Sequence, residues 1–151
     1  MSVTASESTT SPAEPTTDGR FTTSALARRG SLAILFSAAG NALLLAAVLA
    51  SDAVPPFMAL SYGPVIVVSL LGALGATVVY ALLARRVSDP DRTFVRVAAV
   101  ALLLSFVPNV LLFVSDPAVT VGVLLSLASM HVVAAVASVG ALTRGRPASS
   151  S

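Results

Sequence analysis

Four long apolar segments, separated by short polar stretches, dominate the chain. They lie at about residues 31–51, 63–84, 97–115 and 118–142. A helix needs about 20 apolar residues to cross the hydrocarbon core of a bilayer, and each segment is long enough to do so. The pattern therefore predicts an all-α polytopic membrane protein, folded as a bundle of four transmembrane helices.

The two ends of the chain differ from this apolar middle. Residues 1–24 are rich in Ser, Thr, Pro and Glu, and residues 145–151 are similar. Such segments bury too little apolar surface to offset the entropy lost on ordering. We therefore expect two disordered cytoplasmic tails on either side of a transmembrane domain at residues 25–144.

Two Ser-Asp-Pro triplets, at residues 88–90 and 115–117, predict helix starts. An Asp before a helix accepts hydrogen bonds from its free N–H groups, and Pro suits the first helical position because it has no N–H to satisfy. We expect Asp89 and Asp116 to be N-caps. The second triplet would leave only a tight turn between the third and fourth segments, which would form an antiparallel hairpin.

The first and third segments share a short motif. Residues 37–44 and 105–112 both read Ser-x-x-(Gly/Pro)-Asn-x-Leu-Leu. Two repeated helical hairpins, related by an axis along the membrane normal, would produce this likeness. A chance match between segments rich in Leu, Ala and Val would produce it as well, and both interpretations stay open.

Composition and charge add the topology. Hydrophobic residues make up 56% of the chain and charged residues only 11%, whereas soluble domains are about 25% charged. The positive charge comes from arginines that precede the first segment, separate the second from the third, or follow the fourth. These are Arg20, Arg28, Arg29, Arg85, Arg86, Arg92, Arg96, Arg144 and Arg146. By the positive-inside rule, both termini are cytoplasmic in a cell (cytoplasmic) membrane.

The same distribution argues against two other classes of protein. Nucleic-acid binding is not expected, because no compact basic domain is present. The Arg28-Arg29 pair before an apolar run, with a small-residue site at residues 48–50, is also compatible with a cleaved export signal. The apolar part of such signals usually runs only about 7–15 residues, so we favour an uncleaved span.

The only histidine, His131, lies near the midpoint of the fourth segment. Ionisable side chains at that depth are rare and often functional. Asn41 and Asn109 lie close to the same depth, and Ser37 and Ser105 stand one helical turn before them. We predict an intramembrane polar cluster of these residues, which serves either as hydrogen-bonded packing or as a ligand or proton-relay site.

Three further positions predict close helix packing. Pro108 has no N–H for the Leu104 carbonyl, which would leave that acceptor free for the cluster. Gly72 and Ala76 form a small-xxx-small motif, and Ser69 shares their stripe. Small residues at this spacing let two transmembrane helices approach closely.

Several kinds of chemistry have no residues to carry them. The chain has no cysteine and one histidine, which excludes disulfides, thiolate sites and a two-histidine metal site. No acidic residue lies within the apolar segments, no serine has a base beside it, and a glycine-rich phosphate loop is missing. We therefore expect no enzyme activity, no cofactor and no metal.

Residues 92–143 carry a family resemblance. Its signals are Arg92-Thr93-Phe94, the stretch 102–108, Asp116, Thr120 and the run Met130-His131-Val132-Val133-Ala134, with Asn41-Ala42-Leu43 in the first segment. In these positions the chain resembles an uncharacterised family of small four-span prokaryotic integral membrane proteins with a Met-His motif in the last span. The resemblance implies a four-helix membrane fold and no particular activity.

Two functions remain open. The first is a structural or accessory subunit that sits in the lipid bilayer and binds another membrane protein or forms a homo-oligomer. The second is an oligomeric small-solute or ion permeation module that uses His131. Four spans around one polar cluster leave little room for a solute path within a single chain, which favours the accessory subunit.

Overall fold

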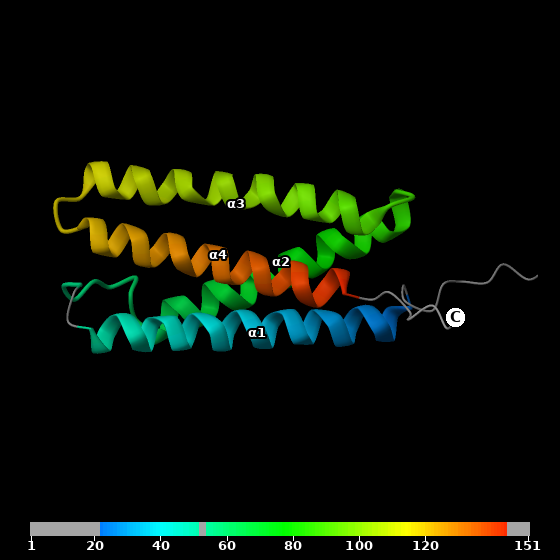
Figure 1. The fold of residues 1–151 in the computed structure, drawn as a ribbon, viewed down its shortest axis with the longest axis horizontal. Helices are drawn as coiled ribbons and strands as arrows, with labels where there is room; N and C mark the ends of the chain where they lie inside the picture. The colour runs from blue at the N-terminus through cyan, green and yellow to red at the C-terminus, as the bar shows by residue number, and fades with distance from the viewer. Residues whose placement is uncertain (1–21, 52–53, 145–151) are drawn as a thin grey trace, which may run out of the picture.

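The computed structural model describes residues 22–51 and 54–144. In this part of the chain four helices run up and down in turn (Figure 1): α1 (Thr23–Ala50), α2 (Tyr62–Arg86), α3 (Pro90–Ser115) and α4 (Val121–Thr143). Each is long and apolar enough to cross a membrane. The predicted all-α membrane bundle is confirmed. The predicted tails lie outside the described residues, apart from residues 22–24.

At one end of the bundle, two helices begin earlier than the apolar pattern indicated. α1 starts well before residue 31, because the Thr22 side chain accepts a hydrogen bond from the Ala25 N–H at 3.3 Å. α3 starts at Pro90, where the Asp89 carboxylate accepts from the Arg92 N–H at 3.1 Å. The predicted cap at Asp89 is confirmed. Polar residues near these starts therefore lie on helices rather than in loops.

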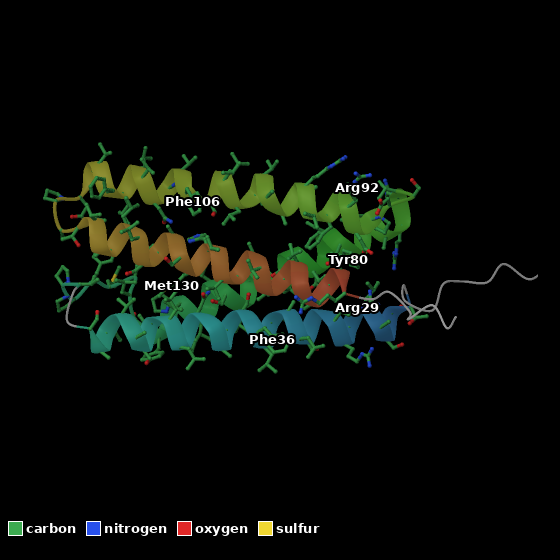
Figure 2. All side chains as sticks on the ribbon, in the orientation of Figure 1. Arg29, Phe36, Tyr80, Arg92, Phe106 and Met130 are labelled. Atoms are coloured by element: carbon green, nitrogen blue, oxygen red, sulfur yellow. The ribbon has the colours of Figure 1, made fainter. Side chains whose placement is uncertain are left out.

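We call this end of the bundle the arginine end, because the described arginines all lie there (Figure 2). Most of them are exposed: Arg28, Arg85, Arg86, Arg92, Arg96 and Arg144. Arg29 is instead 9% exposed, and its Nη1 donates to the Leu142 carbonyl at 3.3 Å. The last carbonyls of a helix have no partner within the helix, so Arg29 stabilises the end of α4. Arg20 and Arg146 lie outside the described residues.

In Figure 1 α4 lies between α1 and α3, and α2 passes behind them; α1 contacts both α2 and α4, whereas α3 packs mainly on α4. The buried residues of α1 recur at every fourth position over most of its length: Arg29, Ala33, Ser37, Asn41 and Leu45. Residues four apart lie on one face of a helix. α1 therefore presents a single continuous stripe to its neighbours, and this stripe is small or polar at several of its positions.

The buried interior is layered. One apolar cluster lies at the end opposite the arginines: Leu45, Leu60, Val65, Val119, Val123 and Met130. The other lies at the arginine end: Ala33, Ala73, Tyr80, Phe94 and Leu142. Between them on α1 and α2 are the buried polar residues Ser37, Asn41 and Ser69, and Asn109, Ser126 and Ser138 are buried on α3 and α4. The polar layer thus occupies the middle of the helices, where hydrocarbon surrounds the bundle.

Tyr80 holds the arginine end of α2 and α3 together. Its side chain is fully buried, and its hydroxyl donates to Asp91 Oδ1 at 2.6 Å. Its ring meets Phe94 edge to face, with centroids 5.3 Å apart and planes at 80°. Edge-to-face packing is a favoured arrangement of aromatic rings. α2 and α3 are therefore fastened to each other at this end by both a hydrogen bond and a ring contact.

Two glycines of α1 lie very close to side chains of neighbouring helices. A Cβ on Gly30 would lie 2.7 Å from Thr77 Cγ2, and a Cβ on Gly40 would lie 2.8 Å from Val133 Cγ1. At Gly72, in contrast, a Cβ would meet nothing within 4 Å. The structure therefore differs from the prediction at Gly72, which borders open space, whereas Ala76 does pack against the cluster at the arginine end.

The start of α4 corrects the second predicted cap. α4 begins at Val121, and its N-cap is Thr120, whose hydroxyl accepts from the Val123 N–H at 3.4 Å. The Asp116 carboxylate instead accepts from the Ala118 N–H at 2.9 Å. This bond folds the chain into a turn directly after α3, so the following proline lies in the turn and not at the first position of α4. The connection is accordingly longer than predicted.

Candidate functional site

Asn41 of α1 is a buried polar residue of the middle layer. Its side chain is 4% exposed, and its Nδ2 donates to Ser69 Oγ of α2 at 2.8 Å. The Ser69 hydroxyl in turn donates to the Val65 carbonyl at 2.7 Å. Asn41 Oδ1 has no hydrogen-bond partner. The amide is thus half satisfied, with one acceptor left over in an apolar environment.

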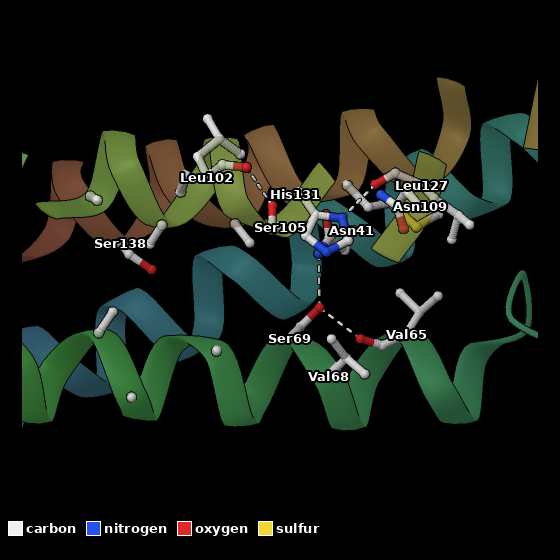
Figure 3. A pocket seen from close by; sticks show the side chains of 18 of the residues that line it. Asn41, Val65, Val68, Ser69, Leu102, Ser105, Asn109, Leu127, His131 and Ser138 are labelled. Carbon is white, nitrogen blue, oxygen red and sulfur yellow. Dashed lines mark hydrogen bonds between the residues drawn. The ribbon is translucent and has the colours of Figure 1, made fainter. Parts of the chain in front are cut away.

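His131 of α4 has a defined tautomer. Its Nδ1 lies 2.7 Å from the Leu127 carbonyl oxygen one turn earlier, as the dashed line in Figure 3 shows. A carbonyl can only accept, so Nδ1 carries the hydrogen and donates it. In the neutral imidazole the other nitrogen is then an acceptor. Nε2 can then accept a hydrogen bond from a group that lies in the plane of the ring at this edge.

Asn109 of α3 provides a hydrogen-bond donor. It is 8% exposed, and its Nδ2 has no hydrogen-bond partner. Ser105, one turn before it, is already satisfied because its hydroxyl donates to the Leu102 carbonyl at 2.7 Å. Leu104 and Pro108 are exposed and lie outside the lining of the cavity described below. Pro108 therefore faces outward on α3, away from the predicted polar cluster.

Ser37 has a separate role. It is fully buried, and its hydroxyl donates to the Ala134 carbonyl of α4 at 3.3 Å. It tightens the α1–α4 contact next to the close approach at Gly40. Ser37 belongs to the helix interface and does not line the cavity to which the other predicted residues contribute.

A cavity of about 510 Å³ brings the remaining members of the predicted cluster together (Figure 3). Asn41, Ser105, Asn109 and His131 all line it. Across the described residues no hydrogen bond links His131 to either asparagine. The cluster is therefore a set of polar groups around a space and is not a closed network. Ligand pockets typically enclose about 300–1,000 Å³, mostly apolar with a few placed polar groups, and this cavity has that character.

Sequence reasoning missed the partner of Asn41. Ser69 shares a stripe with Gly72 and Ala76, but nothing in a single sequence shows which helix that stripe faces. The cavity is also lined by Ser138 and Gly75, whose residue types are common in transmembrane segments and carry no distinctive signal. Within the described residues no group of three His, Asp or Glu side chains is close enough to hold a metal ion. The site can donate and accept hydrogen bonds, and His131 is its only titratable group.

A model of a family of unknown function, DUF6069, matches residues 21–148. The match includes every helix and every residue of the cavity. The chain belongs to the DUF6069 family. Its predicted membership of an uncharacterised family of four-span membrane proteins is confirmed, while the Met-His motif as a family feature and a prokaryotic origin stay predictions. No curated protein and no solved structure matches the chain.

Proposed function

We propose that this protein is an accessory membrane subunit, without enzymatic activity, that binds a second transmembrane segment along α3. The segment belongs to a second copy of the chain or to another membrane protein. One observation carries the proposal: the only buried residues of α3 are Pro90 and Phe94, at the arginine end, and Asn109. Through its membrane-spanning part α3 is attached to the bundle by a very narrow stripe.

This attachment distinguishes α3 from its neighbours. α1 and α2 bury residues along most of their length, whereas most apolar side chains of α3 are exposed. Association of transmembrane helices depends on van der Waals packing and interhelical hydrogen bonds rather than on the hydrophobic effect. A helix with so few buried residues offers such packing to a partner without disturbing the bundle.

The absence of cysteine from the chain allows a clean test. Leu103→Cys and Leu111→Cys place single thiols on α3, at side chains that are 65% and 68% exposed. Leu35→Cys and Leu43→Cys are matched controls on α1, at side chains 59% and 72% exposed. After oxidation in native membranes we expect a disulfide dimer, or an adduct with a specific membrane protein, from the α3 variants only. Equal adducts from both helices, or none from either, would contradict the proposal.

A second function is favoured by one feature of His131. His131 lines the same cavity as the amides of Asn41 and Asn109 (Figure 3). A titratable side chain beside such a cavity is expected for an oligomeric module that lets a small solute or an ion permeate. His131→Ala separates the two functions. If the variant loses flux in proteoliposomes and keeps its thermal stability, permeation is supported. If the wild-type protein shows no flux and the variant is less stable, His131 has a structural role.

We further propose that the protein lies in the cytoplasmic membrane of a prokaryote with the arginine end, and so both termini, in the cytoplasm. The clustering of the described arginines at one end of the bundle supports this orientation, because positive residues are retained on the cytoplasmic side. A reporter that is active only in the cytoplasm should be active when it is fused after Ala148. A periplasmic signal from the same fusion would overturn the orientation.

A further inference from the structure

The cavity is elongated along the helices. On α2 its lining runs from Pro64 to Val79, a distance of about 22 Å at a rise of 1.5 Å per residue. α3 and α4 form its other walls, and Asn41 of α1 lies at mid-length. At the arginine end it is bordered by Phe94, whose ring is held by Tyr80. The space is therefore a slot parallel to the membrane normal, closed at one end by an aromatic pair.

The slot opens sideways, between α2 and α3. A Cβ on Gly72 or Gly75 would meet nothing within 4 Å, so small residues create part of the space. Gly72, Gly75 and Ala101 of α3 line the cavity and are also exposed at the surface of the bundle. At this depth the surface of the bundle is in contact with lipid. A molecule dissolved in the bilayer can thus reach the slot without passing through water.

The middle of the slot holds unsatisfied hydrogen-bonding groups. Asn109 Nδ2 lacks an acceptor and Asn41 Oδ1 lacks a donor, and both side chains are more than nine-tenths buried. His131 Nε2 is a second acceptor, because Nδ1 is already the donor to the Leu127 carbonyl. Buried polar groups are nearly always hydrogen-bonded, and hydrocarbon offers them nothing. Asn41, Asn109 and His131 all line the slot, so a rotation of either amide side chain would turn its unpaired atom toward the polar group of a bound molecule.

The lining argues against a charged occupant. Among the described residues that line the slot there is no Asp, Glu, Lys or Arg, so an ionised group would be unpaired at a depth where that is strongly unfavourable. The slot has a volume of about 510 Å³, within the range of about 300–1,000 Å³ that is typical of small-molecule sites. It fits an uncharged molecule built on a single hydrocarbon chain.

We propose that the slot between α2 and α3 binds an uncharged, lipid-soluble molecule that carries a hydroxyl or carbonyl oxygen on a hydrocarbon chain. The oxygen accepts a hydrogen bond from Asn109 Nδ2, and a hydroxyl also donates to His131 Nε2 or Asn41 Oδ1. The chain lies along the apolar length of the slot. This chemistry is shared by two sources in a cell membrane, isoprenoid alcohols and isoprenoid quinones.

The test uses the full-length protein in lipid nanodiscs with three probes: farnesol, the hydrocarbon of the same skeleton that lacks the hydroxyl, and a short-chain isoprenoid quinone. Binding is measured by native mass spectrometry and by competition with a photoreactive farnesol analogue. Gly72→Leu fills the slot where no atom stands in the way, and Gly63→Leu is its matched control because Gly63 also has open space but does not line the slot. We expect Gly72→Leu to abolish saturable binding and Gly63→Leu to leave it unchanged.

The polar contacts are tested separately. Asn109→Leu should weaken binding of an oxygen-bearing probe about tenfold, as expected for one lost hydrogen bond. Because a quinone has only acceptors, His131→Leu should weaken farnesol binding and leave quinone binding unchanged, which distinguishes the two sources. Gly75→Leu replaces Gly72→Leu if the latter does not fold.

Three outcomes would overturn the proposal. The first is that no probe binds the wild-type protein above its partition into empty nanodiscs. The second is that the bare hydrocarbon binds as tightly as the oxygen-bearing probes, because Asn41, Asn109 and His131 would then contribute nothing to recognition. The third is that binding survives in both Gly72→Leu and Gly75→Leu. None of these outcomes bears on the association along α3, which is measured by disulfide formation at other positions.

Discussion

Gly40→Ala is the most direct test of how α1 packs against α4. The added Cβ would lie 2.8 Å from Val133 Cγ1, whereas carbon atoms in contact are normally about 3.5–4.0 Å apart. Val133 cannot rotate away easily, because a β-branched side chain in a helix has one strongly preferred rotamer. The two helices must therefore separate by several tenths of an ångström, with loss of contacts on both sides.

Overpacking of this kind typically lowers the free energy of unfolding by about 1–3 kcal/mol. Gly72→Ala is the matched control, since the same methyl group there meets nothing within 4 Å. It should leave stability unchanged or raise it by up to about 1 kcal/mol, the difference in helix propensity between Ala and Gly. Equilibrium unfolding in mixed micelles, with increasing SDS, measures both variants against wild type.

The refuting result is equally definite. If Gly40→Ala unfolds at the same SDS fraction as wild type, the α1–α4 approach is not as close as described. A loss at Gly72→Ala equal to that at Gly40→Ala would instead show that Gly72, too, makes a tight contact, as its small-xxx-small spacing predicts. Only a loss at Gly40 alone agrees with the observed arrangement.

Three further changes can be measured in the same unfolding assay. Tyr80→Phe keeps the ring contact but removes a hydrogen bond to a carboxylate, so it should lower stability by about 1.5–3 kcal/mol. In an Asp91→Leu background the same change should cost little, and a double variant whose loss equals the sum of the two single losses would contradict the hydrogen bond. Arg29→Met should lower stability by about 1 kcal/mol through the lost bond to the last turn of α4, while Arg28→Met at the exposed neighbour should have no effect. Asn41→Leu should change stability by less than about 1 kcal/mol, because the loss of one interhelical hydrogen bond is offset by the removal of an unpaired buried acceptor. A loss above about 3 kcal/mol would show that Asn41 Oδ1 has a hydrogen-bond partner in the membrane.

Much of the fold follows from local features of the sequence. The apolar segments are long enough to cross a bilayer, so their backbones must form helices whose hydrogen bonds are satisfied internally. The cap at Asp89 acts within a few residues and is confirmed by its bond to the Arg92 N–H. The second cap failed for an equally local reason, since Asp116 closes a turn with Ala118 instead.

The candidate site was predictable only in part. Asn41, Asn109 and His131 stand out because polar groups are rare inside apolar segments, and the structure places all three around one cavity. The pairing of Asn41 with Ser69 was not predictable, because it depends on how α1 and α2 are rotated about their axes. Ser37 and Ser105 occupy matching positions in the shared motif, yet one binds α4 and the other its own helix.

The difference comes from the solvent. In water, the buried face of a helix is the apolar one, and the hydrophobic periodicity of the sequence reveals it. In a bilayer the outer face is as apolar as the interior, so the residues of this chain mark where its helices run and where polar groups enter the membrane. Which face of each helix turns inward is settled by the packing of small residues, at Gly30 and Gly40 in particular, where α1 meets α2 and α4. The open slot between α2 and α3 exists only because the helices take up that arrangement.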